Sequence, residues 1–299
     1  MSQLVVANAT QQLERDHATW AAWGAGLDRA QFALREQRLR AHPWAAKTLT
    51  SFWWVDASGA PLSSCELFVD EAVVGGQRGL AGTVASVFTE ERLRGRGHAA
   101  AMLEALRQRE ASRLLALTLF SEIGEGLYAR LGYRAVPAFD LFFPASATKP
   151  PRVEWLEGVL PVARPSEALD ALVLPLSATR LDWHLERERI YGEALSRPVL
   201  PFHGARVGAS TITFTAYWKT NELQVLSLDA DDEAVPGLFD AARHAAHVAG
   251  LPVVRWWETR GLPAFADQRR APRTDELPMF LPLRAQATAW VKVERGLWA

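Results

Sequence analysis

The sequence contains very little cysteine, since Cys65 is the single one in 299 residues. One thiol excludes an internal disulfide framework and is typical of proteins from a reducing compartment, so we expect a cytoplasmic protein. The N-terminus lacks a basic segment followed by an apolar run, and no stretch approaches the ~18 consecutive apolar residues of a membrane helix. We therefore expect neither a secretory signal nor a membrane partner.

An excess of charge of one sign is also absent. The 33 lysine and arginine residues are balanced by 34 aspartate and glutamate residues, and neither half of the chain is strongly basic. Proteins that track nucleic-acid phosphates need clustered cations, so we expect no nucleic-acid partner. Apolar residues make up 49% of the chain and charged residues 22%, which excludes a disordered chain.

Tryptophan is absent from a long interval of the chain. All twelve tryptophans lie at positions 20 to 54 or at 155 and beyond. At about 150 residues per domain, the length predicts two domains or one large domain. Pro144, Pro150 and Pro151 stand among small residues, which is typical of a linker. We therefore predict a first domain at 1–145, a linker at 146–153 and a second domain at 154–299.

Hydrophobic periodicity predicts an α/β protein in which strands and helices alternate. In the first domain we expect strands at 4–7, 49–55, 62–69, 82–88, 114–120 and 133–143, and helices at 10–22, 27–41, 97–112 and 125–131. In the second domain we expect helices at 165–173, 178–195 and 233–250, strands at 205–217, 223–229 and 252–258, and a polar loop at 260–278.

A glycine-rich turn joins the strand at 82–88 to the helix at 97–112, and its core is Arg92-x-x-Gly95-x-Gly97. Consecutive backbone N–H groups and the positive end of a helix suit a pyrophosphate. The two glycines permit close approach and unusual dihedrals. The chain has no Gly-Lys-Ser/Thr and no Gly-x-Gly-x-x-Gly followed by an acidic residue, which excludes a P-loop and the usual dinucleotide site.

Two segments resemble the GNAT acetyltransferases. Arg92-Leu-Arg-Gly-Arg-Gly97, after Val87-Phe-Thr89, resembles the acetyl-CoA signature, and 119–133 resembles the later segment in which a Tyr on a short helix precedes Leu-Gly-aromatic. The resemblance implies the GNAT fold, a central mixed sheet flanked by helices, with acetyl-CoA as co-substrate of the first domain. The second domain has no such turn, so we expect a GNAT-like domain without a cofactor motif. Trp218, Trp256, Trp257 and Trp290 are candidates there for the wall of an acceptor cleft or for the core.

A narrower resemblance is to the fungal lysine N6-acetyltransferase family. It rests on Ser63-Ser-Cys-Glu66, Ala85-Ser-Val-Phe-Thr89, Leu119-Phe-Ser-Glu-Ile-Gly124, His42-Pro-Trp44 and, more weakly, Leu277-Pro-Met-Phe280. It implies acetyl transfer to the primary amine of a small molecule, with the N6-amine of free lysine as the first expectation. Another amine (a polyamine, an aminoglycoside or another amino acid) and a catalytically silent acyl-CoA sensor remain open alternatives.

The resemblance also implies roles for individual residues. The strand 84–88 is expected to splay from its neighbour so that its backbone binds the pantetheine arm, and the turn is expected to bind the pyrophosphate. The implied acetyl-CoA-binding residues are Val87, Phe88, Thr89, Arg92, Arg94, Gly95, Arg96, Gly97, His98 and Ala99.

The chemistry needs a base, because a lysine amine has a pKa near ~10.4 and attacks only when neutral. Glu66 is the first candidate and Glu122 the second, although a solvent-facing strand residue and a helix N-terminal charge are the alternative interpretations. The resemblance makes Tyr128 the general acid toward the departing thiolate. We interpret Cys65 as a small buried hydrophobic residue and expect no metal, because no third ligand at a known spacing follows His244 and His247.

Overall fold

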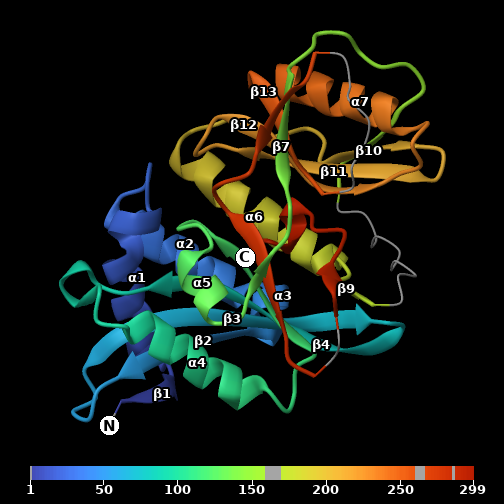
Figure 1. Ribbon diagram of the computed structural model, residues 1–299. Coiled ribbons are helices and arrows are strands. Elements are labelled where there is room, and N and C mark those ends of the chain that lie inside the picture. Colours follow the sequence, from blue (N-terminus) through green and yellow to red (C-terminus); the bar gives the residue numbers. More distant parts are fainter. Residues whose placement is uncertain (1, 159–169, 260–266, 285–286) are drawn as a thin grey trace.

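The computed structural model describes residues 2–158, 170–259, 267–284 and 287–299, and these form two mixed sheets with helices around them (Figure 1). In the first sheet the strand order is β1 (Gln3–Val6), β2 (Leu49–Val55), β3 (Pro61–Val74), β4 (Gln77–Phe88), β5 (Ala116–Ser121), β15 (Leu277–Pro282) and β6 (Arg134–Ala135). Two short strands extend it, since β9 (Ala171–Val173) pairs with β3 and with β16 (Ala289–Trp290).

Helices cover both faces of the first sheet because its central strands alternate in side-chain direction. On β3, Leu67 packs with Met102 and Leu106 of α4 (His98–Glu110), whereas Phe68 packs with Trp44 of α3 (Pro43–Thr48) on the other face. The remaining helices of this half are α1 (Ala9–Trp23), α2 (Arg29–Ala41) and α5 (Gly126–Arg130). Asn8 and Asp28 begin α1 and α2 with capping boxes, which satisfy the first free N–H groups of each helix.

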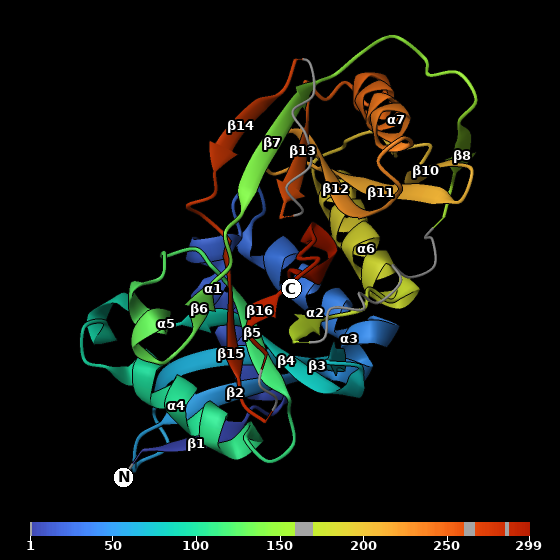
Figure 2. The same cartoon turned by 45° about the vertical axis from the view of Figure 1, so that its right-hand side comes forward.

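The second sheet has the order β14 (Arg269–Pro272), β7 (Phe139–Pro144), β13 (Val253–Glu258), β12 (Glu222–Asp229), β11 (Ser210–Tyr217), β10 (Gly204–Val207) and β8 (Glu154–Leu156). The helix α7 (Val235–Val248) packs its apolar stripe, which includes Leu238 and Phe239, against this sheet. The helix α6 (Ala178–Ala194) lies between the two sheets (Figure 2). It packs Leu181 and Leu185 toward the first sheet and Tyr191 toward the second.

The sheets exchange strands, so the predicted division into 1–145 and 154–299 does not coincide with them. The strand β7 precedes the predicted linker at 146–153 but pairs with β13, from Pro144 opposite Val253 to Phe139 opposite Glu258. Conversely, β15 comes from the C-terminal part of the chain and pairs with β5 in the first sheet, from Leu277 opposite Ser121. This pairing covers an edge of β5 that would otherwise expose its backbone groups.

Two expectations for the second half of the chain need correction. The helix expected at 165–173 falls partly outside the described residues, and its last part is the strand β9. The polar loop expected at 260–278 contains β14 and the start of β15. Pro278 and Pro282 lie in β15 and disguise it in the sequence, because proline is uncommon inside strands.

Within the part of the chain that the structure describes, no helix combines the length and the apolar character needed to span a bilayer.

The strand expected at 133–143 is divided into β6 and β7, which belong to different sheets, and Val136–Ala138 connect them. This break lies at Pro137, which cannot donate a ladder hydrogen bond.

We predict that Met279→Ala destabilises the hydrophobic core between the first sheet and α4. Met279 belongs to this core although most of the other core residues lie more than 150 positions earlier in the chain. Its side chain is fully buried on β15 among Met102, Leu117 and Tyr128. Loss of a buried methionine side chain lowers the free energy of unfolding by about 2–5 kcal/mol, to be measured by urea denaturation. As a control, Val199→Ala at a position 84% exposed changes it by less than about 0.5 kcal/mol. An unchanged midpoint for Met279→Ala would show that β15 does not belong to this core.

Candidate active site

The site begins where two parallel strands separate. The strands β4 and β5 pair from Ala81 opposite Ala116 to Val84 opposite Leu119. Beyond this point both strands continue but no longer pair with each other. On its other side β4 has an irregularity opposite β3, and Ser86 takes a positive φ of 51° there. The backbone of 85–88 is therefore open toward β5. This is the splay that the resemblance implies for 84–88.

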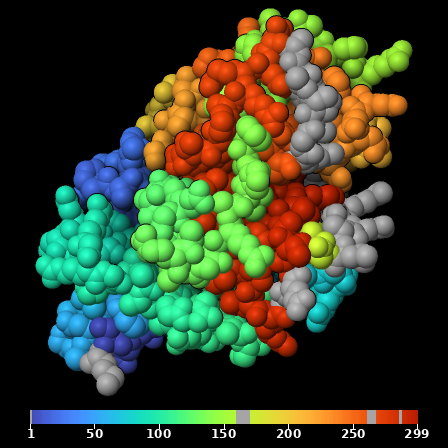
Figure 3. Space-filling model, viewed as in Figure 1, coloured from blue at the N-terminus to red at the C-terminus, as the bar shows by residue number. Residues whose placement is uncertain are grey.

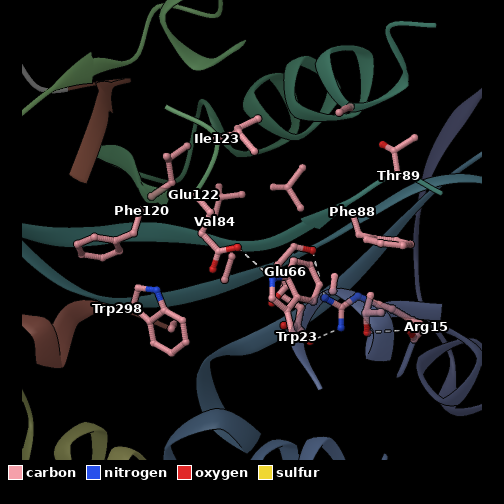
Figure 4. A pocket seen from close by; sticks show the side chains of 18 of the residues that line it. Arg15, Trp23, Glu66, Val84, Phe88, Thr89, Phe120, Glu122, Ile123 and Trp298 are labelled. Atoms are coloured by element: carbon pink, nitrogen blue, oxygen red, sulfur yellow. Dashed lines mark hydrogen bonds and ion pairs between the residues drawn. The ribbon is translucent and has the colours of Figure 1, made fainter. Parts of the chain in front are cut away.

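The opening leads into a cavity of about 900 Å³, which side chains from both sheets line (Figure 4). The labelled residues Glu66, Val84 and Phe88 come from β3 and β4, Glu122 and Ile123 follow β5, and Arg15 and Trp23 come from α1. On the face shown in Figure 3, red C-terminal residues and the green segment around β6 and β7 lie between the two parts of the molecule.

The glycine-rich turn lies at one end of this cavity. After β4 the chain makes a short 3-10 turn, Glu91–Leu93, and Arg94 Nε donates to the carbonyl of Thr89 at 3.0 Å. Gly95 and Gly97 have φ of 76° and 78°, which an L side chain adopts only at a cost. Gly97 caps α4, and Ala101 N–H makes the first bond of that helix, to the Gly97 carbonyl. The N–H groups of residues 98–100 therefore have no partner inside the helix, and such a helix start suits an anion.

Most of the predicted cofactor residues share this end of the cavity, but two do not reach it. The lining residues among them are Val87, Phe88, Thr89, Arg94, Gly95, Gly97, His98 and Ala99. Arg92 and Arg96 are not part of the lining. The Arg92 side chain is 73% exposed and pairs with Glu90 at 2.7 Å.

Tyr128 lies in α5 and lines the cavity while its ring packs edge-on against Tyr133, with 5.9 Å between the ring centroids. Burial raises the pKa of its phenol to about 12, so the hydroxyl keeps its proton at neutral pH. Cys65 is fully buried, and burial raises the pKa of its thiol to about 12 as well. The interpretation of Cys65 as a small buried residue is confirmed, since the protonated thiol is a poor nucleophile.

Glu66 is buried on β3 and forms an ion pair that the sequence did not reveal. Arg15 of α1 donates from Nη1 to Glu66 Oε1 at 3.0 Å and from Nη2 to the carbonyl of Ser86 at 3.2 Å. One guanidinium thus connects α1, β3 and the irregular position of β4. No sequence signal marked Arg15, because α1 buries Arg15 and Asp16 while Leu13 is half exposed.

Glu122 follows β5 and is exposed to the cavity. Trp23 donates from Nε1 to Glu122 Oε2 at 3.1 Å, and the same indole packs edge-on against Phe88 at 5.9 Å (Figure 4). Glu122 therefore has no cation paired with it among the described residues, in contrast to Glu66.

The second half of the chain completes the cavity wall. Its lining side chains are Trp183 and Arg187 of α6, Tyr217 and Lys219 near the end of β11, Trp298 and Ala299. Of the two alternatives for Trp218, Trp256, Trp257 and Trp290, the core is the one that the structure shows, because all four are buried and none lines the cavity. Trp218 and Trp256 pack in the core of the second sheet, and Trp257 and Trp290 pack against Phe120.

The described residues contain no group of three or more His, Cys, Asp or Glu side chains arranged to hold a metal ion. His244 packs against Trp155 instead, with 5.8 Å between the ring centroids.

Comparison with known proteins gives the fold. No protein-family model and no curated protein matches the chain. A probable N-acyltransferase from Enterococcus faecalis V583 is similar in structure over 95% of this chain and 73% of its own, with TM-score 0.63 and 11% identity. A GCN5-related N-acetyltransferase from Kribbella flavida is similar in structure over 95% of this chain and 72% of its own, with TM-score 0.55 and 16% identity.

Eis1 from Mycobacterium abscessus is similar over 95% of this chain and 74% of its own, with TM-score 0.56 and 15% identity. At such identities the similarity shows the fold. The chain has the mixed α/β fold of the GCN5-related N-acetyltransferases, in a two-domain arrangement, as the sequence predicted.

We predict that Glu66→Ala destabilises the protein, because Arg15 would keep its charge in a buried place without its carboxylate. Breaking a buried ion pair by removing one partner costs about 3–5 kcal/mol, to be measured as the free energy of unfolding. Glu71→Ala, on the exposed face of the same strand, serves as the control and is expected to change it by less than about 0.5 kcal/mol. Equal effects of the two substitutions would mean that the Arg15 ion pair adds nothing to stability.

Proposed function

We propose that this protein is an N-acetyltransferase that moves the acetyl group of acetyl-CoA to a primary amine of a small molecule. The observation that carries the proposal is that β4 separates from β5 and opens a large cavity between them. The turn with the positive-φ glycines Gly95 and Gly97 lies at one end of this cavity, and Tyr128 lines its wall. The GNAT fold supports it. The same arrangement would also serve a catalytically silent acyl-CoA sensor, but the buried, protonated Tyr128 favours catalysis.

The residues at the splayed strands fit acetyl-CoA as a co-substrate. Gly95 and Gly97 leave open space where a Cβ would stand, and residues 98–100 offer free N–H groups to a pyrophosphate. On the side of β5, where pairing has ended, the backbone of 85–88 offers N–H and C=O groups to the amide-bearing arm. When bound, acetyl-CoA supplies the activated acetyl thioester. Arg94, which lines the same end, adds positive charge near the phosphates.

The proton of the amine needs an acceptor, and three glutamates line the cavity: Glu36, Glu66 and Glu122. Glu36 already accepts from Arg35. Glu66 Oε1 already accepts from Arg15, whereas Glu122 accepts only from the neutral indole of Trp23. We therefore propose Glu122 as the base and Glu66 as the partner that holds Arg15 against β4. This reverses the ranking that the sequence suggested, because a paired carboxylate is occupied by its cation.

Tyr128 is proposed as the acid that protonates the departing thiolate. A phenol whose pKa is raised to about 12 stays protonated through the physiological range, so its hydroxyl is available to donate to the thiolate as it forms. Val87 lines the cavity, and we propose its amide, at the edge of β4 that faces β5, as the group that polarises the thioester carbonyl.

Free lysine, reacting at its N6-amine, is the acceptor that we propose first. The aromatic side chains Trp23, Trp183, Tyr217 and Trp298 line the cavity and suit an aliphatic chain, while carboxylates and cations suit its charged ends. Polyamines and aminoglycosides carry only positive charge and fit the cations of the wall less well.

The proposal is tested by following release of the CoA thiol from acetyl-CoA with a panel of amines. We expect release with L-lysine and none with lysine whose N6 is blocked. Release with spermidine or an aminoglycoside instead would overturn lysine as the acceptor. Binding of acetyl-CoA without release on any amine would favour the sensor, and no binding would contradict the acetyl-CoA assignment.

Two variants serve as controls in the same assay. Glu122→Gln keeps the size of the side chain and loses the base, so release is expected to fall. Lys149→Gln changes an exposed residue outside the cavity and is expected to leave release unchanged.

We predict that Tyr128→Phe lowers kcat by about 10²-fold or more and leaves the affinity for acetyl-CoA nearly unchanged, because only the proton donor is removed. Steady-state kinetics gives kcat, and calorimetric titration with acetyl-CoA gives the affinity. A loss of affinity at unchanged kcat would show that the residue holds the co-substrate. The conservative change at the neighbouring buried ring, Tyr133→Phe, is the control.

A further inference from the structure

The cations that line the cavity differ in whether a carboxylate of the protein pairs with them. Arg15 pairs with Glu66 at 3.0 Å, as described above. Arg35 donates to Glu36 and, at 2.7 Å, to the hydroxyl of Tyr191. Arg40 binds both oxygens of the fully buried Asp16. These three arginines are therefore committed to internal partners.

Arg187 on α6 is not committed in this way. Its side chain is only 7% exposed, yet it lines the cavity. Nη2 donates to the hydroxyl of Tyr217 at 3.1 Å, and the closest carboxylate oxygen, Glu188 Oε1, lies 3.8 Å from Nη1, beyond hydrogen-bond distance. A guanidinium carries five N–H donors, so most of them have no acceptor among the described residues.

The aromatic surroundings of Arg187 fix its position without neutralising it. Its guanidinium lies 4.4 Å from the ring of Trp298 and 5.1 Å from the ring of Tyr217. Cation–π contacts of this kind stabilise a cation but use none of its N–H donors in the plane. The group is therefore rigid, buried and still able to donate.

A second free cation lines the same wall. Lys219 follows β11 in the turn before β12 and is exposed toward the cavity. Among the described residues it has no ion pair. Both cations belong to the part of the wall built by the second half of the chain. The helix α6, which carries Arg187, packs on one face of the first sheet, and α4, whose first turn fits the pyrophosphate, packs on the opposite face.

We propose that the acceptor carries a carboxylate in addition to its amine, and that Arg187 and Lys219 bind this carboxylate. This inference rests on the proposed function and assigns the side chains that would hold the carboxylate of lysine or of another amino carboxylate. Arg187 supplies the directional N–H donors and Lys219 a mobile point charge. The amine then faces the end of the cavity with Glu122 and Tyr128.

Two probes that differ in the carboxylate alone test the proposal. Calorimetric titration of the full chain, in the presence of CoA, compares 6-aminohexanoate with pentylamine. We expect 6-aminohexanoate to bind at least about tenfold more tightly, because pentylamine lacks the carboxylate that would accept charge-assisted hydrogen bonds from these side chains. Equal binding of the two probes, or no binding of 6-aminohexanoate at millimolar concentration, overturns the proposal.

Variants then assign the effect to these side chains. Lys219→Glu, at an exposed turn position, is expected to weaken 6-aminohexanoate at least about tenfold and to leave pentylamine unchanged or tighter. Arg187→Gln is expected to abolish the preference. Its fold is checked by circular dichroism, and Lys219→Glu keeps the test decisive if Arg187→Gln fails to fold. Lys149→Gln is the matched control outside the cavity. A preference that survives Lys219→Glu contradicts the proposal.

Failure of this inference and failure of the proposed function give different results. If CoA does not bind, the acetyltransferase assignment fails. If CoA binds and amines are acetylated, but carboxylate-bearing amines have no advantage, then only the carboxylate site fails and Arg187 has a structural role beside Trp298.

Discussion

The separation of β4 from β5 is the constraint on which the rest of the site depends. Parallel strands normally continue their ladder, and here pairing ends at Val84 and Leu119 while both strands extend further. The positive φ of Ser86 bends β4, and Arg15 holds that position by binding both the Ser86 carbonyl and Glu66. This buried ion pair thus helps to set the shape of the opening, which exposes backbone groups to a ligand.

The second half of the chain contributes a wall to the cavity and a strand to the first sheet. The strand β15 covers the edge of β5, and Trp298 lies between the guanidinium groups of Arg187 and Arg295, at 4.4 and 4.3 Å. Arg295 is in turn held by Glu276 at 2.6 Å. The two halves of the chain therefore pack together, and both contribute residues to the wall of the cavity.

Local sequence patterns predicted much of the fold and of the anion-binding end. The turn at Gly95 and Gly97 and the helix after it depend on dihedrals and free N–H groups, which neighbouring residues set. Proline and polar patterns misled the prediction elsewhere. Pro278 hid the start of β15, and the ranking of Glu66 above Glu122 did not take account of Arg15, which lies 51 residues from Glu66 in the chain. Helical periodicity would also have turned Arg15 to solvent, whereas α1 buries it and exposes Leu13.

The glycine turn and the short helix that carries Tyr128 could be predicted because each depends on residues that are neighbours in the chain, and the class of fold followed from the resemblance of these two local motifs. Which charged side chains pair with one another in the cavity could not be predicted in this way. Arg35, Arg40 and Arg187 are alike in sequence, yet Arg35 and Arg40 hydrogen-bond a carboxylate, whereas Arg187 hydrogen-bonds Tyr217 and lies 3.8 Å from the nearest oxygen of Glu188. Partners that lie far apart in the chain and close in space set the charge of the site, and periodicity carries no information about them.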